Sequence, residues 1–162
     1  MTGHLKQAGG VMAALALSLA VASPPLAARA ADTGGSRSTA AAAPATAPLD
    51  AARAEIDAGR YAQALRLLAA IVRKEPRNAD ALNLMGYANR KMDRLSEAQR
   101  WYEAALKADP RHAGALEYQG ELFLELGDLD RAWQNLNLLR ASCGNCAEYQ
   151  DLARAIATSQ QG

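Results

Sequence analysis

Apolar positions in the middle of the chain follow two helical periods separated by a short break. In the first period, Leu82, Met85 and Gly86 recur at three- and four-residue spacing, so they lie on one helix face. The second period has its own apolar stripe, formed by Leu95, Ala98, Tyr102, Ala105 and Leu106. The pattern therefore predicts a pair of helices over about 79–92 and 95–108.

This pattern returns 34 residues earlier and 34 residues later along the chain. Residues of the same kind coincide at each shift: Gly86 with Gly120, Ala98 with Ala64 and Ala132, and Pro110 with Pro76. A fixed period with small residues in register is the signature of a helical repeat array. We therefore predict three helix pairs and a single last helix, over about 49–58 with 61–75, 79–92 with 95–108, 113–126 with 129–141, and 146–158.

The small and apolar residues of the repeat have expected packing roles. Gly86 and Gly120 lie inside helical patterns, where glycine costs about 1 kcal/mol relative to alanine. We expect close approach of the second helix to offset this cost, because its Ala98 or Ala132 is also small. In the last pair, the apolar stripe runs through Leu129, Ala132, Trp133, Leu136 and Leu139. The single last helix has one apolar face, and we expect it to cap the array.

These motifs resemble the tetratricopeptide-repeat family, whose pattern is W-x2-L-G-x2-Y…A-x3-F…P. The second unit reads Leu82-x2-Met85-Gly86-x2-Asn89…Ala98-x3-Tyr102…Pro110, and the third reads Leu116-x2-Gln119-Gly120-x2-Phe123…Ala132-x3-Leu136, with Gly144 in place of the proline. The first unit keeps only the second half of the pattern, Ala64-x3-Leu68…Pro76. No tryptophan opens any unit, and Asn89 replaces the usual aromatic residue.

The resemblance covers about Leu49 to Ile156 and implies an all-α, right-handed helical-repeat solenoid. This solenoid would comprise about three helix pairs, in repeats 45–78, 79–112 and 113–146, plus a C-terminal capping helix over 146–158. Together they form one predicted tetratricopeptide-repeat domain, 49–158. The run from Cys143 to Tyr149 is also similar to the tail of some small bacterial periplasmic tetratricopeptide proteins.

The segment before the repeats has the features of an export signal followed by a linker. A short start carrying Lys6 precedes an uncharged apolar run, Val11 to Ala22, that is too short for a membrane span. Ala28-Arg29-Ala30 offers a small-x-small cleavage site, so we predict a signal peptide over 1–30; an uncleaved anchor or a buried helix is the alternative. Residues 31–48 are mainly alanine, proline, glycine, serine and threonine, which predicts a flexible linker. We therefore expect an exported protein, periplasmic if bacterial and otherwise secreted, with no membrane span after cleavage.

Cys143 and Cys146 flank the predicted turn before the capping helix. An exported chain favours oxidation, so a local disulfide is the first interpretation. A redox-active dithiol is the alternative, because a cysteine at a helix N-terminus ionises more readily, although the βαβ context of thioredoxin-like motifs is missing. Haem attachment is excluded because Ala147 rather than histidine follows the pair. We expect no metal site, since His112 is the one histidine after the signal.

Composition and motifs favour a function in binding another molecule over catalysis. The 162-residue chain has a formal net charge of +1, so it lacks the basic footprint of a nucleic-acid-binding protein. The sequence shows no catalytic constellation, and we expect neither enzymatic activity nor a cofactor. The resemblance implies instead that the first helices of the pairs line a concave groove for a protein or peptide partner.

The resemblance assigns this groove to side chains that lie off the packing stripes. Carried onto this sequence, they are Arg53, Ile56, Asn83, Tyr87, Arg90, Lys91, Glu117, Glu121, Leu124 and Glu125. Glu117, Glu121 and Glu125 form an acidic row whose neighbours repel slightly, so the row does not serve helix stability. A solvated face whose acids meet Arg90 and Lys91 is one interpretation. The other is a bipolar groove, basic in the middle and acidic towards the C-terminus, suited to a mixed-charge or helical segment.

The predicted function is an exported adaptor that binds a protein or peptide through its concave face. The lysine and asparagine set with which some family members clamp a C-terminal carboxylate is not reproduced, so that specificity is not transferred. A thiol–disulfide role for Cys143 and Cys146 is one alternative, and it predicts a readily reduced pair. A self-associating structural array, a homo-oligomer, is another, and it predicts a mass that depends on concentration.

Overall fold

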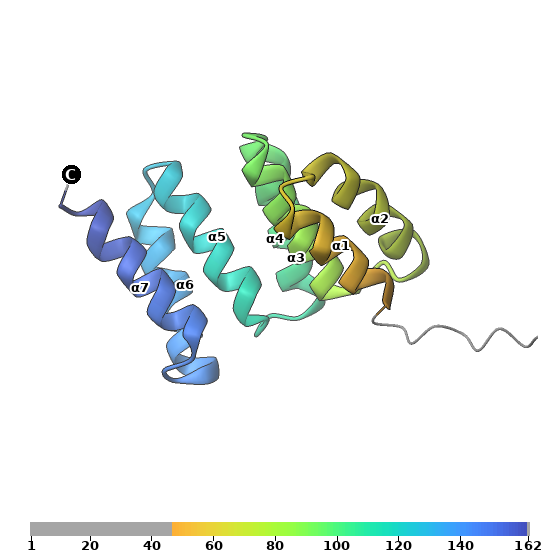
Figure 1. Cartoon of the computed structure of the whole chain (residues 1–162). Coiled ribbons are helices and arrows are strands. Elements are labelled where there is room, and N and C mark those ends of the chain that lie inside the picture. The colour runs from red at the N-terminus through yellow and green to blue at the C-terminus, as the bar shows by residue number, and fades with distance from the viewer. Residues whose placement is uncertain (1–46, 162) are drawn as a thin grey trace, which may run out of the picture. The chain divides into compact units, whose positions relative to one another are not determined.

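The structure, a computed structural model, describes residues 47–161. The predicted signal peptide, 1–30, and nearly all of the predicted linker, 31–48, lie outside the described residues. The described part consists of seven helices: α1 (Ala47–Asp57), α2 (Tyr61–Lys74), α3 (Ala79–Lys91), α4 (Leu95–Ala108), α5 (Ala113–Glu125), α6 (Leu129–Cys143) and α7 (Ala147–Ser159). Within this range there is no strand, and the predicted all-α helical-repeat solenoid is confirmed (Figure 1).

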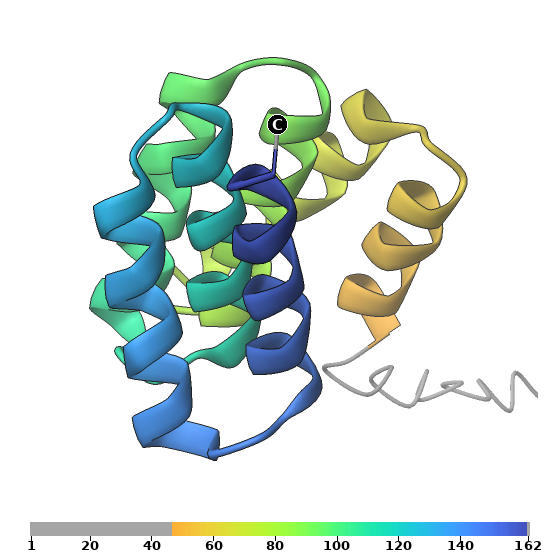
Figure 2. The same ribbon diagram turned by 90° about the vertical axis from the view of Figure 1, so that its left-hand side faces the viewer.

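The helices pack in consecutive pairs, and the first helices of the pairs lie side by side. α1 packs on α2, α3 on α4, and α5 on α6. Because α1 also contacts α3 and α3 contacts α5, first helices make up one face of the repeat array. α7, dark blue in Figure 2, packs against both α5 and α6, as expected of a helix that caps the array.

Equivalent left-handed residues end the first helix of every pair. Gly59, Asp93 and Gly127 have φ values of 71°, 60° and 75°. In each unit the next amide donates back to the helix: Arg60 to the Glu55 carbonyl (2.8 Å), Arg94 to Asn89 (3.0 Å) and Asp128 to Phe123 (2.7 Å). This is the long-range hydrogen bond of a Schellman motif, whose left-handed position suits glycine and is tolerated by aspartate. The chain therefore reverses in the same way in all three units.

Two helix boundaries differ by two residues from the sequence-based prediction, and the others agree with it to within one residue. α1 begins at Ala47 rather than Leu49, because Pro48 falls in the first turn, where a helix needs no amide donor. α6 extends beyond residue 141 to Cys143 and ends at Gly144, whose φ is 72°. Gly144 thus ends the helix in the unit where the family pattern has lost its proline.

The two helical glycines make room for neighbours that the sequence did not predict. A Cβ added at Gly86 would lie 2.4 Å from the Tyr102 ring of α4, so a large ring, and not the small alanine of that helix, approaches the glycine. A Cβ added at Gly120 would lie 2.5 Å from a methyl of Leu152, which belongs to α7 and not to α6. The expected approach of the second helix is therefore confirmed at Gly86, although Tyr102 rather than Ala98 makes the nearest contact, and it is wrong at Gly120, where α7 makes that contact.

Trp133 was wrongly assigned to the apolar stripe of α6. It is 42% exposed, whereas Ala132, Leu136 and Leu139 are buried in the core that α5, α6 and α7 share. The core covers one face of α6, and Trp133 lies outside that face.

Candidate peptide-binding groove

A hollow of about 230 Å³ lies on the face formed by the first helices of the three pairs. Its lining residues are Arg53, Ile56 and Asp57 of α1, Leu84 and Tyr87 of α3, and Tyr118 of α5. The repeat brings them together, because Arg53 and Tyr87 stand one period apart on neighbouring helices, as Leu84 and Tyr118 do. Arg53 and Asp57 are exposed and the other four are half-buried, so apolar and aromatic walls meet a charged rim on α1.

Two tyrosines from different units form the aromatic wall. The ring centroids of Tyr87 and Tyr118 are 4.9 Å apart, with the planes inclined at 49°, within the range of favourable aromatic pairs. The Arg90 guanidinium lies 5.8 Å from the Tyr87 centroid and 5.9 Å from that of Tyr118, and the Lys91 ammonium lies 5.4 Å from Tyr87. At these distances the cations are attracted to the ring faces. The tyrosines therefore link the apolar hollow to the charged groups beside it.

Arg90 connects α3 to α5 next to the tyrosines. Its side chain is 6% exposed, and it donates hydrogen bonds to Glu125 Oε1 at 2.7 Å and to Glu121 Oε2 at 2.5 Å. Burial disfavours its charge, but the neighbouring Tyr102 hydroxyl and the two carboxylates outweigh burial and raise the pKa of Arg90. Arg90 is therefore a charged cross-link between the second and third units, and its charge is balanced within the protein.

Glu117 is a buried carboxyl beside this cluster. It is 8% exposed, and burial raises its pKa to about 7. The carboxylates of Glu121 and Glu148 act in the same direction, and Arg90 opposes them. Because Glu148 belongs to α7, the capping helix contributes a charge to this part of α5.

The predicted groove residues thus fall into three sets. Arg53, Ile56 and Tyr87 line the hollow. A second set adjoins its tyrosines through ion pairs and ring contacts: Arg90, Lys91, Glu121 and Glu125. The remaining residues do not line the hollow, because Asn83 and Glu117 are buried and Leu124 packs against the core shared with α6 and α7.

Three residues of the hollow were missed from the sequence: Asp57, Leu84 and Tyr118. A signal for two of them was available, since Leu84 and Tyr118 occupy the same repeat position and are both large and apolar. They were missed because the groove positions carried over from the family do not include this repeat position.

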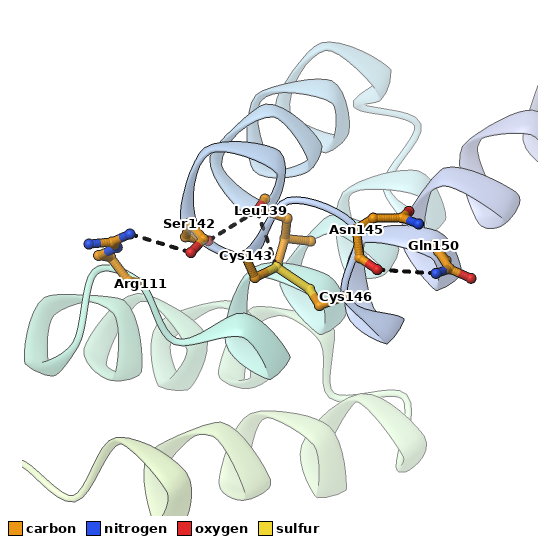
Figure 3. The surroundings of a disulfide bond; sticks show 7 residues. All are labelled: Arg111, Leu139, Ser142, Cys143, Asn145, Cys146 and Gln150. Carbon is orange, nitrogen blue, oxygen red and sulfur yellow. Dashed lines mark hydrogen bonds between the residues drawn. A yellow bond between two sulfur atoms is a disulfide. The ribbon is translucent and has the colours of Figure 1, made fainter.

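Cys143 and Cys146 form a disulfide at the turn between α6 and α7 (Figure 3). Arg111, from the segment before α5, donates to the Ser142 carbonyl at 3.3 Å, and Gln150 of α7 donates to the Asn145 carbonyl at 3.2 Å. Cys143 is exposed, whereas Cys146 is half-buried and packs against the core of the third unit. The turn that positions α7 is therefore fixed covalently and by polar contacts.

A larger, open depression of about 570 Å³ lies at the turn between α1 and α2. Its charged groups pair with one another, since Arg60 Nε donates to Glu55 Oε2 at 2.6 Å. The smaller hollow is the better candidate site, because it joins three units and has aromatic walls.

No helix among residues 47–161 combines the length and hydropathy that a membrane span needs. Within the same residues, no three histidine, cysteine, aspartate or glutamate side chains gather in a way that could hold a metal ion.

The paired helices define a helical-repeat protein, and part of its sequence matches a known repeat family. Residues 55–116 match the tetratricopeptide repeat family model, which confirms the resemblance. No curated protein sequence matches the chain.

Solved structures of tetratricopeptide-repeat proteins share the fold at low sequence identity. The TPR2B domain of yeast Sti1, in complex with pHsp70, is 14% identical with a TM-score of 0.66, over 72% of this chain and 96% of that one. The Yersinia enterocolitica type III secretion chaperone SycD, in complex with a peptide of the translocator YopD, is 18% identical with a TM-score of 0.61, over 70% and 87%. The first TPR of Spaghetti (RPAP3), bound to the HSP90 peptide SRMEEVD, is 15% identical with a TM-score of 0.63, over 73% and 94%.

Proposed function

We propose that the chain is an adaptor that binds a segment of another protein on the face of α1, α3 and α5, without chemistry of its own. The observation that carries this proposal is the hollow beside the Tyr87–Tyr118 pair, which three units build together. Half-buried aromatic side chains in a concave surface are the usual anchors of a binding site.

Structures of similar fold support a peptide or protein as the ligand. SycD is bound to a peptide of YopD, and the first TPR of RPAP3 to an HSP90 peptide. A short array of this kind offers an extended surface formed by neighbouring repeats, which suits a chain segment better than a small molecule.

Site-specific photocrosslinking tests the proposal. A photoreactive residue at position 87 is expected to capture one partner band in cells, because that side chain lines the hollow. The same photoreactive residue at position 138 is the matched control, since Leu138 is 51% exposed on α6, the second helix of the third pair. Capture at 138 and not at 87 would place the binding surface on the other side of the repeats. Sedimentation of the purified protein at several concentrations measures its mass. A mass that rises with concentration would indicate self-association rather than capture of another protein.

Export to the periplasm or the cell exterior is part of the proposal. It is supported by the signal-like segment 1–30 and by the cysteine pair. N-terminal sequencing of the native protein is expected to begin after Ala30. An intact Met1 in the cytoplasmic fraction would refute export.

A thiol–disulfide role is the second candidate, and the exposed position of Cys143 favours it. A redox-active pair equilibrates with glutathione at potentials of about −120 to −270 mV, whereas structural disulfides lie below about −300 mV. A measured potential below about −300 mV would exclude the thiol–disulfide role and leave only the adaptor role.

A further inference from the structure

Two of the three basic groups on the groove face form ion pairs within the protein. Arg90 is buried between two carboxylates, as described above. Arg53 donates to Asp50 at 3.3 Å and to Asp80 at 3.5 Å. Lys91 is exposed and stacks on Tyr87. Arg90 is therefore unavailable to an anionic ligand, and at Arg53, whose side chain is 45% exposed, such a ligand would compete with two carboxylates.

Apart from Arg53 and Asp57 of α1, whose opposite charges balance, acidic groups outnumber the basic ones beside the tyrosines. Two cations, Arg90 and Lys91, face the four carboxyl groups of Glu117, Glu121, Glu125 and Glu148. Burial keeps Glu117 partly protonated near neutral pH, so the excess of negative charge rests mainly on the other three. The predicted bipolar groove is therefore acidic on its α5 side once Arg90 is paired.

Two of these carboxylates remain open to a ligand. The side chains of Glu121 and Glu125 are 28% and 44% exposed, and only one oxygen of each bonds to Arg90. A carboxylate has about four acceptor sites, so each can also accept a hydrogen bond from a lysine or arginine of a partner.

The acids and the apolar hollow lie along one face of α5. Tyr118, Glu121 and Glu125 stand three and four residues apart, which places them on the same side of the helix. The hollow is smaller than the roughly 300–1,000 Å³ of a small-molecule site, so it suits a single large apolar side chain.

We propose that the groove takes a cationic protein segment, with one large apolar side chain in the hollow and lysine or arginine side chains on Glu121 and Glu125. The charge complementarity and the adjacent apolar hollow carry this inference. It rests on the proposed function and adds the chemistry of the partner. It also separates this chain from RPAP3, whose bound HSP90 peptide, SRMEEVD, is acidic.

Fluorescence anisotropy with defined peptides tests the inference on the full chain without its signal segment. The probes are a short synthetic peptide with one phenylalanine and three lysines, its glutamate analogue, its alanine-for-phenylalanine analogue, and SRMEEVD. We expect the lysine peptide to bind at least about tenfold more tightly than the other three and to weaken as salt rises.

Variants connect the selectivity to the named side chains. Glu121→Gln with Glu125→Gln is expected to lose most of the preference for lysine, because the glutamines keep an oxygen for Arg90 but remove the charge. Glu103→Gln, on the exposed surface of α4, is the matched control and should change nothing. Circular dichroism establishes that the variants stay folded, and the salt dependence of the wild-type protein needs no variant at all.

Equal or tighter binding of the glutamate analogue or of SRMEEVD overturns the inference, and so does a lack of binding by every peptide. Successful photocrosslinking at position 87 together with either result would leave the adaptor function standing and reject only the cationic partner. Failure of the crosslinking at 87 would reject the adaptor function itself.

Discussion

The second and third repeat units have the same sequence pattern, but a different helix fills the space beside the helical glycine in each of them. In the second unit, Gly86 of α3 faces the ring of Tyr102, which belongs to the paired helix α4. In the third unit, Gly120 of α5 faces Leu152, which belongs to α7. The same glycine position therefore accepts a contact from within the unit in one case and from the capping helix in the other.

This difference implies that the third unit depends on α7 for its stability, whereas the second does not. Leu152 is fully buried, in one core with Leu116, Phe123 and Leu136 of α5 and α6. In repeat arrays each unit contacts only its neighbours, so loss of a terminal contact destabilises the adjacent unit first.

The largest effect is expected from Leu152→Ala, which removes the α7 side of this contact. Leucine-to-alanine changes in a core cost roughly 2–5 kcal/mol, and we expect about 3 kcal/mol in the free energy of unfolding. Urea denaturation followed by circular dichroism measures it. Hydrogen exchange should show α5 and α6 losing protection before α3 and α4.

Leu138→Ala is the matched control for this change. Leu138 is 51% exposed, so the same substitution should cost less than about 0.5 kcal/mol. Equal losses of protection in the second and third units of Leu152→Ala would contradict the proposed dependence on α7.

Gly86→Ala is expected to have the next largest effect, about 2 kcal/mol of lost stability. Its Cβ would meet the buried Tyr102 ring, and the strain exceeds the gain of about 1 kcal/mol in helix propensity. Gly120→Ala should cost less, because Leu152 can change its side-chain rotamer.

A double-mutant cycle sharpens the comparison between the two glycines. In the Leu152→Ala background, Gly120→Ala should become neutral or stabilising, since its obstacle is gone. Gly86→Ala should cost the same in both backgrounds. Thermal and urea denaturation of the four proteins provide the cycle, and an unchanged cost of Gly120→Ala would exclude Leu152 as the obstacle.

Loss of the disulfide is expected to act on the third unit alone. A loop this short gives at most about 2 kcal/mol on the chain-entropy model, and the effect reaches α5 through the two helices that the turn joins, α6 and α7. Denaturation of Cys143→Ser with Cys146→Ser, compared with the reduced wild-type protein, measures it. Loss of exchange protection in α3 and α4 would show that the turn matters beyond its own unit.

The smallest effect concerns Glu117, whose counterpart in the second unit is the uncharged Asn83. The folded-state pKa of Glu117, about 7, lies above its ordinary value of 4.5. The wild-type protein should therefore lose stability as the pH rises from about 4.5 through about 7, because the buried carboxyl must ionise. Glu117→Gln should match the wild type near pH 4 and exceed it by about 1 kcal/mol near pH 8. A pH-independent difference between the two proteins would assign the effect to packing rather than to ionisation.

Much of the fold could be predicted because its signals are local. The 34-residue register placed the three helix pairs, and the capping helix followed from the apolar face that includes Leu152 and Ile156. The candidate groove was predicted less completely. Arg53 and Tyr87 line the hollow, but Asn83 and Glu117 are buried, because repeat positions fix the side of a helix and not the depth of each side chain.

The sequence by itself determined the helices, their turns and their order, since apolar periodicity and left-handed residues such as Gly59 and Gly127 act within a few residues of the chain. Only the tertiary structure decided that Leu152 fills the space at Gly120 and that Arg90 is neutralised by Glu121 and Glu125. These contacts join residues 32, 31 and 35 positions apart, and they depend on how whole helices approach one another in space. The sequence pattern of one helix does not specify how closely another helix approaches it.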